Sequence, residues 1–222
     1  MNIISLFSGC GGLDLGFERA GFDIPVANEF DPTIFETFKV NHPKTHLIEG
    51  DVRQITKEDI APYINGEVDG IIGGPPCQSW SEAGSLRGIE DARGKLFYDY
   101  IRILKEFNPK FFLAENVSGM LLERHRPALE EIKRLFTEAG YNLSFTPVNA
   151  WHYGVPQDRE RVLFVGYRSD IGRTFTMPPA LSEEKRLTLR DAIGDLVDVK
   201  PGSRKAGLVP PPENLVVANH EY

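Results

Sequence analysis

The sequence has few of the features that mark secreted, membrane-spanning and metal-stapled proteins. It contains only two cysteines, Cys10 and Cys77, which cannot build a disulfide scaffold or a four-thiolate zinc site. No stretch approaches the roughly 20 apolar residues that span a bilayer. A signal peptide has basic residues before its apolar run, and no Lys or Arg precedes Cys10 here. The apolar run at the N-terminus is also too short for a signal peptide. We therefore expect a soluble protein of the cytoplasm.

An excess of basic charge is also missing. Lys and Arg number 25 against 32 Asp and Glu, so the formal net charge is −7. A protein that binds nucleic acid by charge alone would be basic, so any contact with DNA must be local or shared with another segment. The composition, 41% hydrophobic and 26% charged, is that of a globular protein and excludes a disordered tail, a collagen-like chain and a coiled coil.

Short apolar runs alternate with amphipathic segments along most of the chain. This alternation predicts strands over 3–7, 26–30, 46–48, 70–72, 111–114, 143–148 and 161–167, the last two as an antiparallel pair. It predicts helices over 12–20, 96–107, 126–139 and 189–196, and another that Asp31 caps. The polar segment 77–94 is predicted to be a long loop, which is usually functional or disordered.

Strands that alternate with helices indicate an α/β protein with a doubly wound, mostly parallel sheet. Ligands of such sheets bind beyond the carboxyl ends of the strands. That rule places five residues along one edge of the predicted sheet. They are Gly9, Glu29, Asp51, Cys77 and Glu115.

The glycine-rich turn after the first strand, Phe7-Ser8-Gly9-Cys10-Gly11-Gly12, is typical of a cofactor site at a helix N-terminus. A dinucleotide fingerprint would need a third glycine where Asp14 stands. Glu29 could bind a ribose diol, Asp51 an adenine amino group, and Phe30 could stack on the ring. The set favours S-adenosylmethionine over NAD, although a purely structural turn is an alternative.

Candidate catalytic residues are predicted along the same edge, after later strands. Cys77 lies in Pro-Cys-Gln at a strand exit, which is a poor place for a buried structural thiol, and a thiol needs activation to act as a nucleophile. Glu115 directly follows a predicted strand. Arg159 and Arg161 alternate, so both should lie on one face of a strand. The alternatives are a surface acid for Glu115 and a solvated, salt-bridged edge for the two arginines.

Five blocks, in this order, resemble the C5 class of DNA cytosine methyltransferases. They are FSGCGGLDLGF, NEFD, GGPPCQSWS, AENV and QDRERV, which together span almost all of residues 3–168. The stretch from Gly73 to Leu104 and the closing NHEY are most similar to the HaeIII type of bacterial modification enzyme, which methylates within GGCC. The resemblance implies the S-adenosylmethionine-dependent methyltransferase (Rossmann-like) fold and a place in a restriction-modification system.

The resemblance also implies a role for each matching residue. Cys77 would add to C6 of a flipped cytosine, Glu115 would contact N3, Arg161 would hold O2, and Arg159 would support Cys77 or a phosphate. The expected S-adenosylmethionine-binding residues are Phe7, Gly9, Gly11, Gly12, Glu29, Phe30, Asp51, Val52 and Pro76. The expected contacts to double-stranded DNA are Gln78, Ser81, Arg87 and Arg93.

The resemblance stops where the target recognition region of the class should begin. Members of the class continue with a target recognition region, an Arg-x-x-Thr-x-x-Glu block and a Gly-Asn-x-x-Pro block, and neither block occurs here. We expect residues 1–178 to form the catalytic and cofactor-binding domain and 179–222 a linker and the start of a recognition region. The chain would then be a catalytic half, truncated or completed by a second polypeptide. The alternatives are a non-catalytic S-adenosylmethionine-binding remnant and an RNA cytosine-5 methyltransferase.

Overall fold

The computed structural model describes residues 1–76 and 96–194. The chain divides into two compact units. The first comprises Met1–Pro147 and Arg161–Met177, and the second comprises Val148–Glu160 together with the segment from Pro178 onward.

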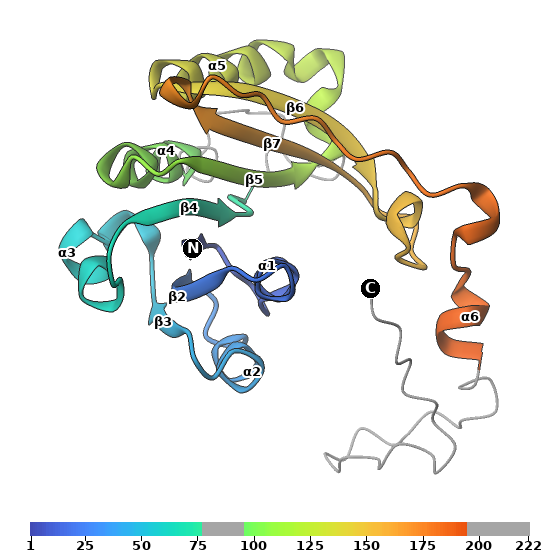
Figure 1. Cartoon of the computed structure of the whole chain (residues 1–222), viewed down its shortest axis with the longest axis horizontal. Coiled ribbons are helices and arrows are strands. Elements are labelled where there is room, and N and C mark those ends of the chain that lie inside the picture. Colours follow the sequence, from blue (N-terminus) through green and yellow to red (C-terminus); the bar gives the residue numbers. More distant parts are fainter. Residues whose placement is uncertain (77–95, 195–222) are drawn as a thin grey trace. The chain divides into compact units, whose positions relative to one another are not determined.

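Seven strands and six α-helices are formed by the described residues (Figure 1). The strands are β1 (Asn2–Leu6), β2 (Asp23–Glu29), β3 (His46–Glu49), β4 (Val68–Gly73), β5 (Phe111–Val117), β6 (Tyr141–Asn149) and β7 (Glu160–Arg168). The helices are α1 (Gly12–Arg19), α2 (Phe35–Asn41), α3 (Lys57–Ile60), α4 (Leu96–Phe107), α5 (Arg126–Glu138) and α6 (Leu189–Ile193).

The strands form one sheet in the order β3-β2-β1-β4-β5-β7-β6. The pairs β1–β2, β1–β4, β2–β3 and β4–β5 are parallel. The order reverses between β1 and β4, and in a doubly wound sheet this reversal is where the connections diverge and leave a crevice for a ligand. The predicted α/β, doubly wound and mostly parallel fold is confirmed.

β7 is the exception to the parallel arrangement. It pairs with β5 in the antiparallel sense, from Phe111 opposite Tyr167 to Val117 opposite Arg161. Its first residues therefore lie beside the carboxyl end of β5, at the edge where the parallel strands end. The next neighbour of β7 is β6. Backbone hydrogen bonds join Gly140 to Ser169 and Ala150 to Arg159. The partner number falls as the residue number rises, as expected for the predicted antiparallel pair.

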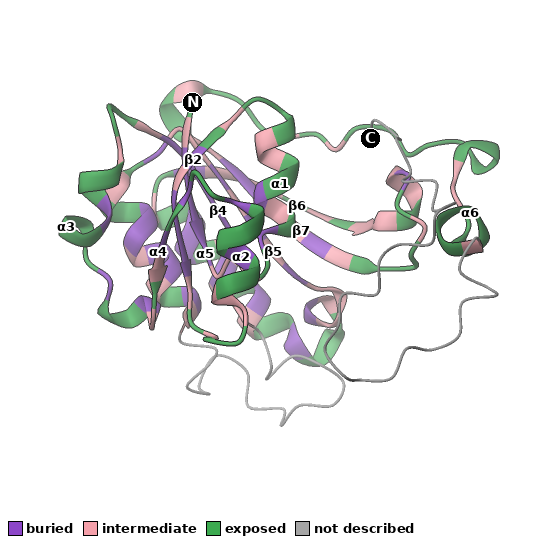
Figure 2. Cartoon of the chain, turned by 90° about the horizontal axis from the view of Figure 1, so that it is seen from below, coloured by how far each residue is buried: buried purple, intermediate pink, exposed green. Residues whose placement is uncertain are grey.

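The side chains of the central strands alternate between two apolar layers, and Figure 2 shows that these strands are largely buried. On one face, Ile3, Ile24 and Ile72 pack with Phe17 of α1 and with Phe111. On the other face, the core contains residues of β1, β4, β5, α4 and α5. An aromatic cluster dominates this second layer, with Phe112 and Phe136 stacked at 4.1 Å between ring centroids.

Two glycines allow the phenylalanines of β5 to lie flat against neighbouring strands. Gly70 of β4 is paired with Phe111, and Gly166 of β7 with Phe112. A β-carbon at Gly70 would lie 2.4 Å from the ring of Phe111, and one at Gly166 would lie 2.2 Å from the ring of Phe112. Because consecutive residues point to opposite faces, each ring covers one glycine on its own side of the sheet.

Three details differ from the sequence prediction. The side chain of Asp31 accepts from the backbone N–H of Thr33 at 2.9 Å, so it closes a turn before α2, whose N-cap is Ile34. Glu115 lies within β5, because Glu115, Asn116 and Val117 still pair with β7. β7 begins at Glu160, so Arg159 precedes the strand that was expected to contain both arginines. No helix in the described part of the chain is long and apolar enough to cross a membrane.

Candidate active site

The turn between β1 and α1 has an unusual backbone. Phe7, Gly9 and Gly11 all have positive φ, at 54°, 57° and 82°. This conformation is readily adopted by glycine but costs energy for phenylalanine. The Gly9 N–H donates to Oε2 of Glu29 at 2.7 Å, so the glycine turn is tied to the carboxyl end of β2.

Glu29 is held by backbone amides. Besides the Gly9 N–H, its carboxylate accepts from the N–H groups of Phe30 and Asp31, both at 2.8 Å to Oε1. Three amide donors fix the orientation of this carboxylate before any ligand arrives. Such a preorganised acceptor suits a ligand with hydroxyl groups, since little side-chain freedom remains to be lost on binding.

A cavity of about 630 Å³ opens beside the turn, beyond the ends of β1, β2 and β4. This volume lies within the range of small-molecule sites. Six of the nine predicted cofactor residues line it, namely Phe7, Glu29, Phe30, Asp51, Val52 and Pro76. Of the other three, Gly9 and Gly11 lie in the turn itself and Gly12 is the first residue of α1. Sequence reasoning missed five lining residues, Asn28, Asp31, Arg53, Gly74 and Leu96, of which Asn28 and Asp31 flank the predicted Glu-Phe pair.

The lining suits S-adenosylmethionine. Phe30 is 66% exposed at the cavity, so its ring offers an apolar surface on which a base could stack. The fixed carboxylate of Glu29 could accept from ribose hydroxyls, and the acidic side chains of Asp31 and Asp51 would favour a ligand with positively charged groups.

Asp51 is not simply available to a ligand in this structure. Its carboxylate forms a two-pronged ion pair with Arg53, including a bond from Nε to Oδ2 at 2.8 Å. The Arg53 guanidinium lowers the pKa of Asp51, mainly through these hydrogen bonds. The Arg53 side chain is 58% exposed and can leave the pair at little cost. An adenine amino group would therefore compete with Arg53 for this carboxylate.

The predicted acid and one predicted arginine meet at the next strands along the sheet. Arg161 Nε lies 2.7 Å from Oε1 of Glu115, and both side chains are largely shielded from solvent. The antiparallel pairing of β7 with β5 brings the two residues together, because Arg161 stands opposite Val117, two residues beyond Glu115. A charge-assisted bond of this kind orients both groups.

The Glu115 carboxylate also approaches the end of β4. A β-carbon built on Gly74 would lie 3.5 Å from Oε2 of Glu115. Gly74 lines the cavity as well. The cavity and the Glu115–Arg161 pair are therefore separated by a single residue without a side chain.

Asn116 is a buried polar residue that the sequence did not single out. Its side-chain amide donates to the carbonyl of Pro75 at 3.0 Å, and its Oδ1 accepts from the N–H of Val117. It thus ties β5 to the Pro-Pro segment that leads to Cys77. The only signal in the sequence is its place beside Glu115.

Arg159 lies in the second unit, in the segment between β6 and β7. Its backbone N–H donates to the side chain of Asn149 at 3.3 Å, and its carbonyl accepts from Ala150. Five of the predicted residues lie outside the described part of the chain: the predicted nucleophile Cys77 and the predicted DNA contacts Gln78, Ser81, Arg87 and Arg93. Their roles stay predictions.

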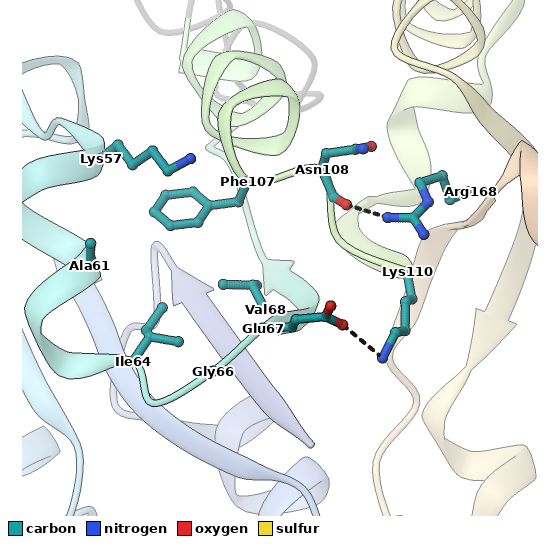
Figure 3. Close-up of a pocket in the computed structure, with 10 residues that line it drawn as sticks. All are labelled: Lys57, Ala61, Ile64, Gly66, Glu67, Val68, Phe107, Asn108, Lys110 and Arg168. Atoms are coloured by element: carbon teal, nitrogen blue, oxygen red, sulfur yellow. Dashed lines mark hydrogen bonds and ion pairs between the residues drawn. The ribbon is translucent and has the colours of Figure 1, made fainter.

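A second cavity, of about 520 Å³, lies at the start of β4 and the end of β7 (Figure 3). Its cations already have partners within the protein. Lys110 bonds Asp69 at 2.6 Å, Arg168 donates to the carbonyl of Asn108, and Lys57 donates to the carbonyl of Glu106. These pairs leave little to attract a charged ligand, so we assign this cavity no role.

Comparison with known proteins agrees with this geometry. A family model described as "C-5 cytosine-specific DNA methylase" matches residues 1–212. The chain is 57% identical to the type II methyltransferase M.NgoPII of Neisseria gonorrhoeae over 100% of its own length, and 40% identical to M.AquIA of Picosynechococcus over 99%. It also resembles the crystal structure of a protein described as a prophage-encoded DNA modification methyltransferase of Escherichia coli. That match has a TM-score of 0.74 and 34% identity over 87% of this chain and 54% of the other.

The relatives differ in length. The chain spans 64% of M.NgoPII but 98% of M.AquIA. More than a third of M.NgoPII therefore has no counterpart in these 222 residues.

Proposed function

Because the chain belongs to the family of C-5 cytosine-specific DNA methylases, we propose that it carries the cofactor site and the catalytic groups of a DNA cytosine-5 methyltransferase. The observation that carries the proposal is the position of Gly74. This residue borders both the cavity and the Glu115 carboxylate. A methyl donor in the cavity and a target cytosine at Glu115 would therefore meet at the end of β4.

S-adenosylmethionine would supply an electrophilic methyl group. Glu29 would hold its ribose, Phe30 would stack on its base, and Asp51 would accept from the adenine amino group after Arg53 moves aside. The glycine turn would let the ligand approach the backbone closely.

The target cytosine must leave the duplex, because its ring carbons are covered by stacking. The Cys77 thiolate would form a bond to C6, and the electron pair of the C5–C6 double bond would move to C5 and toward N3. Glu115 faces N3 in this scheme, and Arg161 holds O2 while keeping Glu115 oriented. Glu115 would donate a proton or a hydrogen bond to N3 as the ring becomes electron-rich, and C5 would take the methyl group from the sulfonium, which would leave as the neutral thioether S-adenosylhomocysteine. A base would then remove the C5 proton, the electron pair would restore the C5–C6 double bond, N3 would return its proton, and the Cys77–C6 bond would break to release the thiolate.

The double-stranded DNA substrate, the target GGCC and a role in restriction-modification are the finer parts of the proposal. GGCC rests on the likeness of the catalytic half to enzymes of the HaeIII type. We also propose that a second polypeptide or a further segment supplies the recognition region, because the chain spans only 64% of M.NgoPII. Its site of action would be the cytoplasm.

Covalent trapping tests the chemistry. The chain is incubated with S-adenosylmethionine and a duplex that carries 5-fluorocytosine within GGCC, with and without the part of M.NgoPII that lies outside the match. Since fluorine cannot leave as a proton does, a competent enzyme stays attached through its nucleophile. We expect a denaturant-stable adduct that Cys77→Ser abolishes.

Two controls separate the parts of the proposal. A duplex with the fluorocytosine outside GGCC tests the recognition sequence, and a folded RNA with the same base tests the substrate class. An adduct that persists in Cys77→Ser would refute the assigned nucleophile. The lack of any adduct under all conditions, despite cofactor binding measured by calorimetry, would favour a non-catalytic protein.

A further inference from the structure

The space beside Gly11 is filled by a histidine outside every motif described above. A β-carbon added to Gly11 would lie 2.0 Å from Nε2 of His42 and 2.4 Å from its Cδ2. Real β-carbons make no non-bonded contacts this short, so the imidazole ring occupies the space that a side chain at Gly11 would need. Gly11 has φ +82° and is the N-cap of α1.

His42 is held firmly in this position. Its side chain is 2% exposed, and its ring stacks on Phe38 with 4.7 Å between centroids. Its Nδ1 lies 3.1 Å from Oε2 of Glu18 in α1. Its backbone N–H bonds the carbonyl of Phe38 at 2.8 Å and so ends α2. The ring therefore joins the end of α2 to α1 directly beneath the turn.

A second acid of α1 lies near the same ring. Asp14 is fully buried one helical turn before Glu18, and its oxygens make no hydrogen bond that satisfies ordinary geometry within the described residues. Burial raises the pKa of Asp14, while Ser5 and the His42 ring oppose that rise.

We propose that His42 is a positioning residue for the cofactor site, whose ring supports Gly11 from below and keeps the glycine turn in its ligand-binding conformation. The inference rests on the proposed cofactor site. The turn needs such support because Phe7 has positive φ, at 54°, a conformation that costs energy for a residue other than glycine and persists only when the surroundings impose it. Gly9 transmits the position of the turn to Glu29 through its 2.7 Å hydrogen bond.

A merely structural histidine would make a different prediction. Its loss would lower the stability of the fold but leave the affinity for S-adenosylmethionine unchanged at temperatures where the variant is fully folded. A positioning residue changes the affinity itself. His46 provides a matched control, because it also stacks on an aromatic ring, that of Tyr63 at 3.7 Å, but lies at the start of β3.

The test is a double-variant cycle with the full chain, in which the dissociation constant for S-adenosylmethionine is measured by calorimetry at low temperature. We expect His42→Ala to weaken binding about 5- to 10-fold and His46→Ala to leave it unchanged. Gly11→Ala should weaken binding more than about 10-fold in the wild type, because the turn must move away from the ring and because alanine is strained at φ +82°. In the His42→Ala background, the loss caused by Gly11→Ala should be at least about fivefold smaller.

Each outcome decides one point. Equal losses from Gly11→Ala in both backgrounds, or wild-type affinity in folded His42→Ala, would overturn the role of His42 and leave the cofactor site intact. A lack of binding by the wild type would instead overturn the cofactor site, and the positioning role with it. His42→Asn keeps a donor for Glu18 without the ring. Because the inference assigns support to the ring, this variant should bind as weakly as His42→Ala.

Discussion

The two glycines at the end of β4 should respond very differently to the same substitution. A β-carbon at Gly73 would lie 2.4 Å from the backbone oxygen of Leu6 and 3.3 Å from the ring of Tyr100. Gly73 pairs with Leu6 in the parallel ladder, so the oxygen cannot move without spreading β1 from β4. Among the described residues, the atom nearest to a β-carbon at Gly74 would be Oε2 of Glu115, at 3.5 Å, which is an ordinary contact.

Gly73→Ala should therefore act as an overpacking substitution that costs about 2–3 kcal/mol. For a protein of this length, each kcal/mol lowers the melting temperature by about 2–4 °C, so a fall of roughly 4–12 °C is expected. Gly74→Ala should change stability by less than about 0.5 kcal/mol. Its methyl group would instead stand between the cavity and Glu115, and the rate of adduct formation with the fluorocytosine duplex should fall.

Thermal unfolding of both variants, followed by circular dichroism, measures the first effect, and trapping at a temperature where both are folded measures the second. Equal melting temperatures for the two variants would refute the reasoning, because it rests on the difference between 2.4 and 3.5 Å. Unchanged trapping by Gly74→Ala would contradict the placement of the base beside Gly74.

Three further predictions concern charged groups. Arg161→Ala removes a charge-assisted bond to Glu115 worth about 1.5–3 kcal/mol, so the trapping rate should fall roughly 10- to 150-fold. A fall of less than about threefold would contradict a role of this pair in the reaction. Arg53→Ala releases Asp51, and calorimetry should show S-adenosylmethionine bound up to about fivefold more tightly, whereas weaker binding would assign the arginine to the ligand. Asp14 has a raised pKa because it is buried, so the folded state keeps its proton longer than the unfolded state. Its contribution to stability is therefore full below about pH 4 and is lost as the pH rises toward the raised pKa, and urea unfolding of Asp14→Asn should show a shallower decline over that window.

The fold was largely predictable because its signals are local. The apolar runs of the parallel strands and the periodicity of α4 and α5 depend only on neighbouring residues, and α4 has the predicted bounds. Glu115 was placed after its strand because polar residues usually end an apolar run. In the structure β5 continues through Glu115, since β7 supplies hydrogen-bond partners that lie almost 50 residues later in the sequence.

The candidate site was predictable only for residues whose place is set by their own stretch of sequence. Glu29, Phe30 and Asp51 lie at strand ends and line the cavity as expected. The contacts between Asn116 and Pro75, and between His42 and Gly11, join residues more than 30 positions apart. No periodicity or spacing encodes such contacts. The pairing of Asp51 with Arg53 is local, but which partner an exposed carboxylate adopts depends on the surrounding surface.

The hairpin connection between β6 and β7 has a consequence for how related chains can diverge. Its two ends are fixed by adjacent strands of the sheet, and the backbone bond between Ala150 and Arg159 closes it at its base. The entropy of closing a loop grows slowly, by about 0.6 kcal/mol for each doubling of its length. Trp151, His152 and Tyr153 are hydrogen-bonded to the segment that begins at Pro178, so an insertion there would break contacts. An insertion at the exposed Val155 would cost mainly this small loop entropy. The length of this connection can therefore vary while the Glu115–Arg161 pair, which lies on β5 and β7, stays in place.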